Sequence, residues 1–274
     1  MPELPEVETI RLNLEQHIIN RTILDVEVHD VRLRWPVQPQ DFEKWINGQA
    51  IIKLSRRSKY LIFHLDNKAA IIIHLGMSGR LGMFSGEEPL EKHTHVVFCL
   101  DNGLEIRYRD PRRFGLVEVT APDTLSVYPR FSHLGVEPLS KKFDAAYVSS
   151  KSERSKKAIK LWIMDAQNVV GVGNIYASEA LFNARIHPER PANSLTSDEQ
   201  HNLASSIKLI LSTAIEHGGT TLSDFRNAHG EPGYFQQELA VYQKAGDFCK
   251  TCGAEIQKIV LSGRSTFFCP ACQK

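Results

Sequence analysis

Four cysteines near the end of the chain constrain its fold more than any other feature of the sequence. Cys249 and Cys252 form one C-x2-C pair, Cys269 and Cys272 form a second, and sixteen residues separate the pairs. This spacing lies within the range of paired zinc knuckles, in which four thiolates hold one metal ion. The sequence therefore predicts one structural Zn2+ and no redox or nucleotide cofactor.

The rest of the chain is long enough to build hydrophobic cores of its own. With 274 residues it can form one large or two ordinary domains, so zinc is needed only locally. No secretion signal or long apolar stretch is recognisable, and the fifth cysteine, Cys99, lies in an apolar run typical of a buried strand. We therefore expect a soluble protein of the reducing cytoplasm, without disulfides and without a membrane partner.

The spacing of apolar residues separates a β-rich region from a helical one. After Pro5, apolar residues at 7, 10, 14 and 18 predict an amphipathic helix. Turn signals then separate short apolar runs that predict a β-sandwich or barrel, at 23–28, 50–54, 60–65, 70–75, 96–100, 104–108 and 116–119. Helical periodicity covers 151 to about 217, and short predicted strands bracket the cysteines at 239–242, 256–261 and 266–268.

These patterns predict a multidomain α+β protein. We expect an N-terminal helix with a β-sandwich over residues 1–130 and a linker rich in Pro, Ser and Gly over 131–150. A helical domain over 151–235 and a zinc ribbon over 236–274 complete the chain. A monomer is the simplest oligomeric state for such a chain.

The distribution of charge is more informative than the formal net charge of +1. Residues 151–160 hold five basic residues against one acidic, and 240–274 hold five against two. Two further basic clusters are Arg107, Arg109, Arg112 and Arg113, and Arg56, Arg57 and Lys59. Taken singly, each cluster is more often a solvated surface. Together with a zinc ribbon, they favour a nucleic-acid partner.

The first residues carry a second chemical signal. Once Met1 is removed, Pro2 has a free secondary amine at the start of a helix. An α-amino group has a pKa of roughly 8, against about 10.4 for lysine, so far more of it is in the nucleophilic form at neutral pH. Attack on a sugar C1′ gives a cationic iminium, an electron sink for later elimination, and Glu3 is close enough in sequence to donate a proton.

The chain resembles the bacterial formamidopyrimidine-DNA glycosylase family (Fpg, also called MutM). The residues that carry the resemblance are Met-Pro-Glu-Leu-Pro-Glu-Val-Glu-Thr at the start, Arg56 to Leu61, His74 to Gly79, Asp110 to Gly115, Val170 to Tyr176 and the four cysteines. They span essentially the whole chain. The resemblance implies a bifunctional enzyme of base excision repair that removes oxidised purines, such as 8-oxoguanine and formamidopyrimidines, from double-stranded DNA. It then cuts the abasic strand by β,δ-elimination.

The resemblance also implies roles for individual residues and a helical domain of helix-two-turn-helix type. Pro2 becomes the Schiff-base nucleophile, Glu3 the general acid, and Lys59 and Arg264 assist the catalysis. The residues that fill the void left by the everted base are Met77, Arg112 and Phe114. DNA contacts fall on His74, His93, Arg112, Lys160, Asn174 and Arg264. Residues 218–234 resemble a mobile loop that covers the everted base.

Two positions depart from the family pattern. Leu161 stands where proline commonly follows the lysine, and Gln243 stands in place of glycine after Val-Tyr.

An endonuclease VIII-type glycosylase for oxidised pyrimidines is the main alternative. Leu4, residues 6–9 and the 110–115 loop favour the purine branch. A catalytically silent zinc-ribbon DNA-binding protein would not need Pro2, Glu3 and Lys59 together. The resemblance places the protein in the bacterial cytoplasm, in association with DNA.

Overall fold

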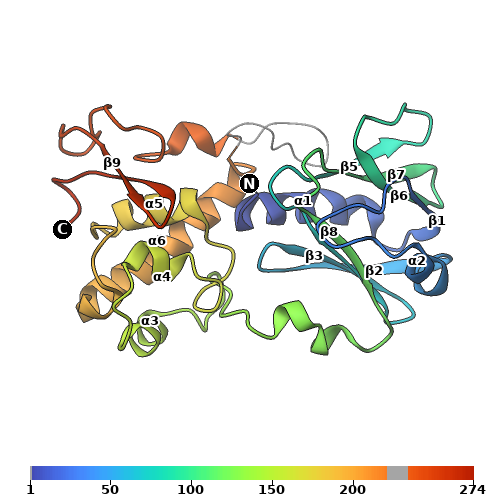
Figure 1. The fold of residues 1–274 in the computed structure, drawn as a ribbon, viewed down its shortest axis with the longest axis horizontal. Helices are drawn as coiled ribbons and strands as arrows, with labels where there is room; N and C mark the ends of the chain where they lie inside the picture. The colour runs from blue at the N-terminus through green and yellow to red at the C-terminus, as the bar shows by residue number, and fades with distance from the viewer. Residues whose placement is uncertain (1, 221–233) are drawn as a thin grey trace. The chain divides into compact units, whose positions relative to one another are not determined.

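The computed structural model describes residues 2–220 and 234–274, which form two compact units (Figure 1). Of the described residues, those up to Ser132 and those from His217 to Tyr234 belong to the first unit, and the remainder form the second. Among the described helices, none is long and apolar enough to cross a membrane. The division of the sequence into four segments stays a prediction, and a helix, α3 (Ala145–Ser152), begins inside the expected linker.

The first unit is a β-sandwich of antiparallel strands. The hydrogen-bonded order of the strands is β5-β7-β6-β1-β2-β3-β4-β8. Because β1 and β2 pair only at Thr22–Ala50 and Ile23–Gln49, this junction divides the strands into two sheets of four. The strands are β1 (Thr22–Val28), β2 (Gln49–Arg57), β3 (Tyr60–Leu65), β4 (Ala70–His74), β5 (Arg80–Ser85), β6 (Thr94–Leu100), β7 (Leu104–Arg109) and β8 (Leu116–Thr120).

Helix α1 (Leu4–Ile18) closes the core of this unit and confirms the predicted N-terminal helix. Its apolar stripe, Val7, Ile10, Leu14 and Ile18, is buried, and α1 contacts β2, β3 and β5. A capping box between Glu3 and Glu6 begins the helix, with proline in its first turn. The helix therefore starts directly behind Pro2 and Glu3.

The sequence patterns missed two elements of the first unit. Strand β5 is an edge strand with only Leu81 fully buried, so its apolar alternation is weak. Helix α2 (Pro39–Trp45) is one short amphipathic segment whose single buried residue is Phe42. Both segments are too short or too exposed for periodicity to identify. Short 3-10 turns at Leu125–Val127 and Pro129–Phe131 end the first of the two segments of this unit.

The second unit is helical and carries the ribbon. Helices α4 (Ile159–Ile163), α5 (Asn174–Asn183) and α6 (Ser197–Glu216) lie where helical periodicity predicts them. α5 contacts both α4 and α6, and it also contacts strand β10 (Arg264–Phe268) of the ribbon hairpin. The other hairpin strand is β9 (Gln257–Leu261), and 3-10 turns occur at Ala192–Ser194 and Phe235–Glu238.

The expected strand at 239–242 is wrong. The segment pairs with a side chain instead, because the buried carboxylate of Glu179 on α5 accepts hydrogen bonds from the backbone N–H groups of Ala240, Val241 and Tyr242 at 2.7–3.0 Å. Burial raises the pKa of Glu179, and these three bonds oppose that rise. A sequence pattern of alternating apolar residues cannot distinguish this arrangement from a strand.

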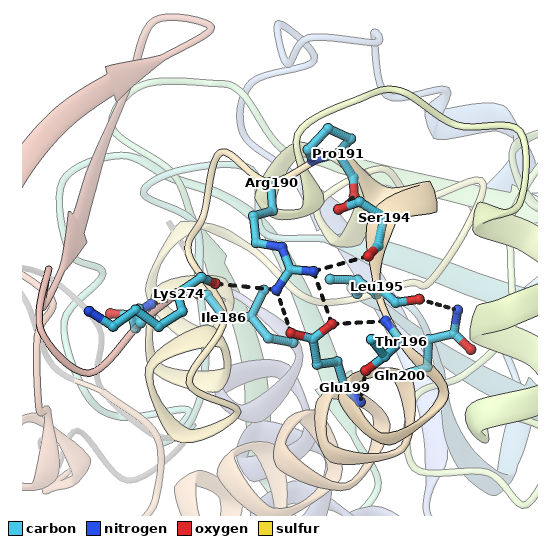
Figure 2. A network of polar contacts seen from close by, with 10 residues as sticks. Ile186, Arg190, Pro191, Ser194, Leu195, Thr196, Glu199, Gln200 and Lys274 are labelled. Atoms are coloured by element: carbon cyan, nitrogen blue, oxygen red, sulfur yellow. Dashed lines mark hydrogen bonds and ion pairs between the residues drawn. The ribbon is translucent and has the colours of Figure 1, made fainter.

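A polar network joins the end of the chain to the start of α6 (Figure 2). Arg190 binds the carboxylate of Glu199 through both terminal nitrogens and donates to the backbone oxygens of Ser194 and Lys274 at 3.0 and 3.3 Å. Thr196 and Glu199 form the reciprocal bonds of a capping box at the start of the helix. The last residue of the chain is therefore held by the same arginine that stabilises the first turn of α6.

Candidate functional site

The four cysteines form a compact cluster in the second unit. The Sγ atoms of Cys249, Cys252, Cys269 and Cys272 all lie within 4.8 Å of one another. Both pairs lie in tight backbone turns, and Gly253, with φ +76°, lets the first turn close with its N–H bonded to the Cys249 carbonyl. Four thiolates at this separation suit tetrahedral Zn2+ and leave no position for water or substrate. The predicted zinc site is confirmed, and its role is structural.

The ribbon hairpin presents Arg264 at its tip. Ser262 and Gly263 form the turn between β9 and β10, and both have positive φ, +48° and +74°. Two central residues with positive φ make a tight two-residue hairpin whose twist matches its strands. Arg264 is exposed at the first position of β10, opposite Leu261. The zinc site at the base of the hairpin and the tight turn at its tip both restrict the position of this guanidinium.

Lys160 lies beneath the surface of the second unit. The side chain is 0% exposed, and Nζ donates to Asn174 Oδ1 at 2.7 Å, Thr266 Oγ1 at 2.7 Å and the Ser265 carbonyl at 3.1 Å. Asn174 Nδ2 donates to the same Ser265 carbonyl at 2.9 Å. These bonds connect α4 and the start of α5 to the strand residue that follows Arg264.

The two glycines of the 168–174 segment end one turn and begin a helix. Gly171 has φ +80°, and Gly173 is the N-cap of α5, which starts at Asn174. The N–H groups of a first helical turn have no partner within the helix, and they bind anions such as phosphate. The segment therefore turns at Gly171 and leads through the N-cap Gly173 into the first turn of α5.

Pro2 and Glu3 are buried at the start of α1. Glu6 holds this end of the helix, because its Oε2 accepts from the Glu3 N–H at 2.7 Å and its Oε1 accepts from the Thr220 N–H at 2.8 Å. Most of the expected 218–234 loop lies outside the described residues, and Thr220 is the last described residue before the gap. Sequence reasoning missed the role of Glu6, although a glutamate three residues after the N-cap is a recognised capping signal.

Lys59 lies on the turn between β2 and β3, not inside a strand. The preceding residue, Ser58, is buried with φ +56°, and its carbonyl accepts from Arg56 Nη1 at 2.8 Å. Arg56 Nε in turn donates to Glu8 on α1 at 2.7 Å. The turn that carries Lys59 is thereby anchored to the helix that begins behind Pro2.

His74, at the end of β4, is a neutral imidazole. Its Nδ1 accepts the N–H of Gly76 at 3.0 Å, so the ring proton is on Nε2. Burial, followed by the nearby charges of Lys59, Arg34 and Arg130, lowers the pKa of His74 to about 4. His74 can therefore donate one uncharged hydrogen bond at neutral pH.

His93 lies just before β6 with φ +71°, partly exposed. Desolvation, followed by the charges of Lys92 and Arg109, lowers its pKa. Its carbonyl accepts from the Asp110 N–H at 3.1 Å. The backbone of His93 therefore supports the start of the 110–115 loop, and its side chain is left at the surface.

Met77, Arg112 and Phe114 lie on exposed loops of the first unit. Met77 is 41% exposed and Phe114 is 42% exposed, so neither is a core residue. The Arg112 guanidinium lies 4.8 Å from the centroid of the Phe114 ring. The two loops touch, because a Cβ added to Gly76 would come within 2.4 Å of the Phe114 backbone. The loop of Met77 therefore lies against the loop of Arg112 and Phe114, although the two loops are distant in sequence.

The fold and the site define a two-unit α+β protein with a β-sandwich, a helical unit and a structural zinc ribbon. Three family models match the chain: the formamidopyrimidine-DNA glycosylase N-terminal domain at residues 1–117, its H2TH domain at 134–226, and a zinc finger found in FPG and IleRS at 246–274. Formamidopyrimidine-DNA glycosylases of Sodalis glossinidius and Escherichia coli are 51% and 49% identical to this chain, over 100% of each protein. The chain belongs to the formamidopyrimidine-DNA glycosylase family.

Solved structures agree with this assignment and with the predicted fold class. A wild-type Lactococcus lactis FPG complex with DNA containing an oxidised pyrimidine has a TM-score of 0.91, with 38% identity and 100% coverage of both chains. A complex of the same bacterium's enzyme with DNA containing Fapy-dG has a TM-score of 0.90 and 38% identity, and covers 99% of this chain and 100% of that one.

Proposed function

We propose that this enzyme excises oxidised purines from double-stranded DNA and then cuts the abasic strand by β,δ-elimination. The observation that carries the proposal is the burial of Pro2 and Glu3 at the capped start of α1, at the positions that match the family's N-terminal motif. A helix N-terminus disfavours a positive charge and so increases the fraction of unprotonated amine. The solved complexes with Fapy-dG and with abasic-site DNA support the substrate class.

The chemistry begins at Pro2 after Met1 is removed. The Pro2 nitrogen attacks C1′ of the damaged nucleotide, the N-glycosidic bond breaks, and the base leaves with a proton. Glu3 protonates O4′ as the C1′–O4′ bond opens, which leaves an iminium between Pro2 and C1′. Loss of a C2′ proton then expels the 3′ phosphate, and a second elimination expels the 5′ phosphate. Hydrolysis of the iminium returns the free amine. Lys59 assists these steps as a proton donor and phosphate ligand, and Arg264 assists them as a phosphate ligand.

Eversion of the damaged base requires that the gap in the duplex be filled. Met77 and Phe114 supply apolar surface, and Arg112 supplies donors to the orphaned partner base. The exposure of Met77 and Phe114, and the contact between Arg112 and Phe114, support this role.

Phosphate contacts hold the duplex in register and make binding sensitive to salt. His74, His93, Asn174 and Arg264 serve this role directly. Lys160 serves it indirectly, because its buried ammonium holds Asn174 and the strand next to Arg264. Each of the two units thus supplies residues that we propose to contact DNA.

Trapping with borohydride tests the mechanism. Reduction of the iminium gives a stable crosslink, and mass spectrometry should locate it on Pro2 with an 8-oxoguanine duplex. Glu3→Gln should still be trapped by a preformed abasic site, because the amine is intact, yet should excise the base slowly. A crosslink on a lysine, or lesion binding without any crosslink, contradicts the assignment of Pro2.

Oxidised pyrimidines are the second candidate substrate. The solved Lactococcus lactis complex with an oxidised pyrimidine in its DNA favours some activity toward them. Single-turnover rates on matched duplexes with 8-oxoguanine or thymine glycol decide between the two. Faster excision of thymine glycol would assign the enzyme to the pyrimidine branch.

A further inference from the structure

Asp110 is a buried carboxylate at the end of β7. It is 0% exposed, and its oxygens accept from Ser78 Oγ at 2.6 Å, the Gly115 N–H at 2.8 Å, the Arg112 N–H at 3.3 Å and the Tyr108 hydroxyl at 3.3 Å. These donors replace the water that a carboxylate loses on burial.

The backbone of Asp110 is held as firmly as its side chain. Its N–H donates to the His93 carbonyl at 3.1 Å, and its carbonyl lies 2.8 Å from Nε2 of the buried His95. Because β6 carries His95 and β7 leads into Asp110, the carboxylate is fixed to the sheet rather than to a flexible loop. Asp110 therefore restricts the positions of the side chains and backbone groups that are hydrogen-bonded to its carboxylate.

The side-chain bonds of Asp110 join two separate loops. Ser78 belongs to the loop after β4 and is the direct neighbour of Met77, whereas Arg112 and Gly115 belong to the loop after β7 and flank Phe114. Ser78 Oγ donates to Asp110 and also accepts the Arg112 N–H at 3.2 Å. Arg112 is therefore bonded to the Asp110 carboxylate through its own N–H. Met77 and Phe114 each lie next to a residue that is bonded to this carboxylate, Ser78 and Gly115 respectively.

We propose that Asp110 is a positioning residue that holds the two loops together as one preformed wedge for insertion into the duplex. The inference rests on the proposed function and adds the group that organises the wedge. Loops that are ordered only on insertion would lose conformational entropy at the moment of base eversion, and prior ordering removes that cost. The expected defect of a loosened wedge is slow eversion, with the bond-breaking chemistry left intact.

Two substitutions test the proposal, with a third as control. Ser78→Ala removes the bond between the loops and leaves the carboxylate in place. Asp110→Asn replaces an acceptor by an amide that cannot accept from all four donors. Tyr108→Phe removes a donor to the same carboxylate from the strand side and leaves the hydrogen bonds from both loops to Asp110 in place. The substrates are one duplex with paired 8-oxoguanine and the same duplex with a preformed abasic site, which has no base to evert.

We expect single-turnover excision of 8-oxoguanine to slow by about 3- to 10-fold in Ser78→Ala and by about 10- to 100-fold in Asp110→Asn, as loss of a charge-assisted hydrogen bond implies. Incision of the abasic duplex should change by less than about 3-fold, and Tyr108→Phe should keep the wild-type ratio of the two rates. 2-Aminopurine placed beside the lesion should show delayed unstacking in both loop variants.

Equal slowing on both substrates, or no slowing in Ser78→Ala with unchanged thermal stability, overturns the proposal. If Asp110→Asn does not fold, Ser78→Ala decides alone. A wild-type enzyme that processes neither substrate would instead contradict the proposed function, so the two failures are distinguishable.

Discussion

The β-sandwich unit and the zinc ribbon are stabilised by different means. The sandwich buries a continuous apolar core drawn from α1 and both sheets. The hydrophobic cluster of the ribbon is small, with Val241, Ile256 and Phe267 buried beside the ligands Cys249 and Cys269, whereas Val260 and Phe248 are exposed. A cluster of this size cannot offset the conformational entropy that the ribbon loses on folding. Binding of the metal must therefore supply the remaining free energy. The sandwich should therefore be independent of zinc, whereas the ribbon should not.

Removal of zinc should have the largest effect. Because metal binding supplies the folding free energy of such a ribbon, chelation should unfold residues 246–274 and lower DNA affinity by on the order of 100-fold or more, through loss of Arg264 from the interface. Hydrogen exchange should show loss of protection in the ribbon and retained protection in β1–β8. Cys99→Ser is the matched control and should keep its zinc. If the ribbon amides stay protected from exchange after complete chelation, the ribbon does not depend on zinc for its folding.

A cavity in the sandwich core is the reciprocal experiment. Phe63 is 1% exposed and stacks on Phe98 with 6.4 Å between centroids, so Phe63→Ala should lower the free energy of unfolding by about 3–5 kcal/mol. Ile52, 51% exposed on β2, is the control, and Ile52→Ala should cost less than about 1 kcal/mol. Urea unfolding measures both. Zinc content should not change in either variant, and zinc loss from folded Phe63→Ala would couple the two regions.

Disruption of the polar network in Figure 2 tests whether the metal alone stabilises the ribbon. Glu199→Ala removes the partner of Arg190 and half of the capping box of α6, and should cost about 1–2 kcal/mol. The hydrogen bonds of Arg190 lower the pKa of Glu199. The stabilisation is therefore fully present when the pH is above 4.5, the ordinary pKa of glutamate, and it is lost progressively as the pH falls below that value. A stability difference from wild type that does not shrink as the pH is lowered below 4.5 would contradict this account.

A charged contact on the ribbon and a neutral one on the sandwich should differ in their response to salt. Arg264→Ala should reduce the slope of log Kd against log salt by about 0.9, the value for one released counterion. His74→Gln should weaken binding without changing the slope, since the His74 imidazole is neutral at pH 7. Fluorescence anisotropy between about 50 and 200 mM salt measures both slopes. Equal slopes for wild type and Arg264→Ala would exclude the phosphate contact.

The smallest expected effect is at Gln243, beside the ribbon. This exposed residue has φ +60°, a conformation that costs a side chain about 1–2 kcal/mol and costs glycine nothing. Gln243→Gly should raise the free energy of unfolding by up to about 1 kcal/mol, because the added flexibility of the unfolded chain offsets part of the gain. Gln243→Ala keeps the strain and serves as control. A loss of stability in the glycine variant would mean that the glutamine side chain makes a favourable contact.

Much of the fold follows from local signals in the sequence. The helices at α1, α5 and α6 have clear apolar periodicity, and seven of the eight sandwich strands overlap the predicted runs. The elements that were missed, α2, α3 and β5, are short or half exposed, and the wrong strand at 239–242 has its N–H groups bonded to Glu179. Local patterns cannot reveal a partner 62 residues away in the chain.

What the sequence by itself determined is the chemistry that depends on short spacings. The zinc ligands are recognisable because each pair must be two residues apart, and Pro2 and Glu3 stand out because they precede a helix. Only the tertiary structure decided that Lys160 is buried, that His74 is neutral, and that Asp110 joins the loops of Met77 and Phe114. Burial and hydrogen bonding between distant segments set these properties, and both exist only once the chain has folded.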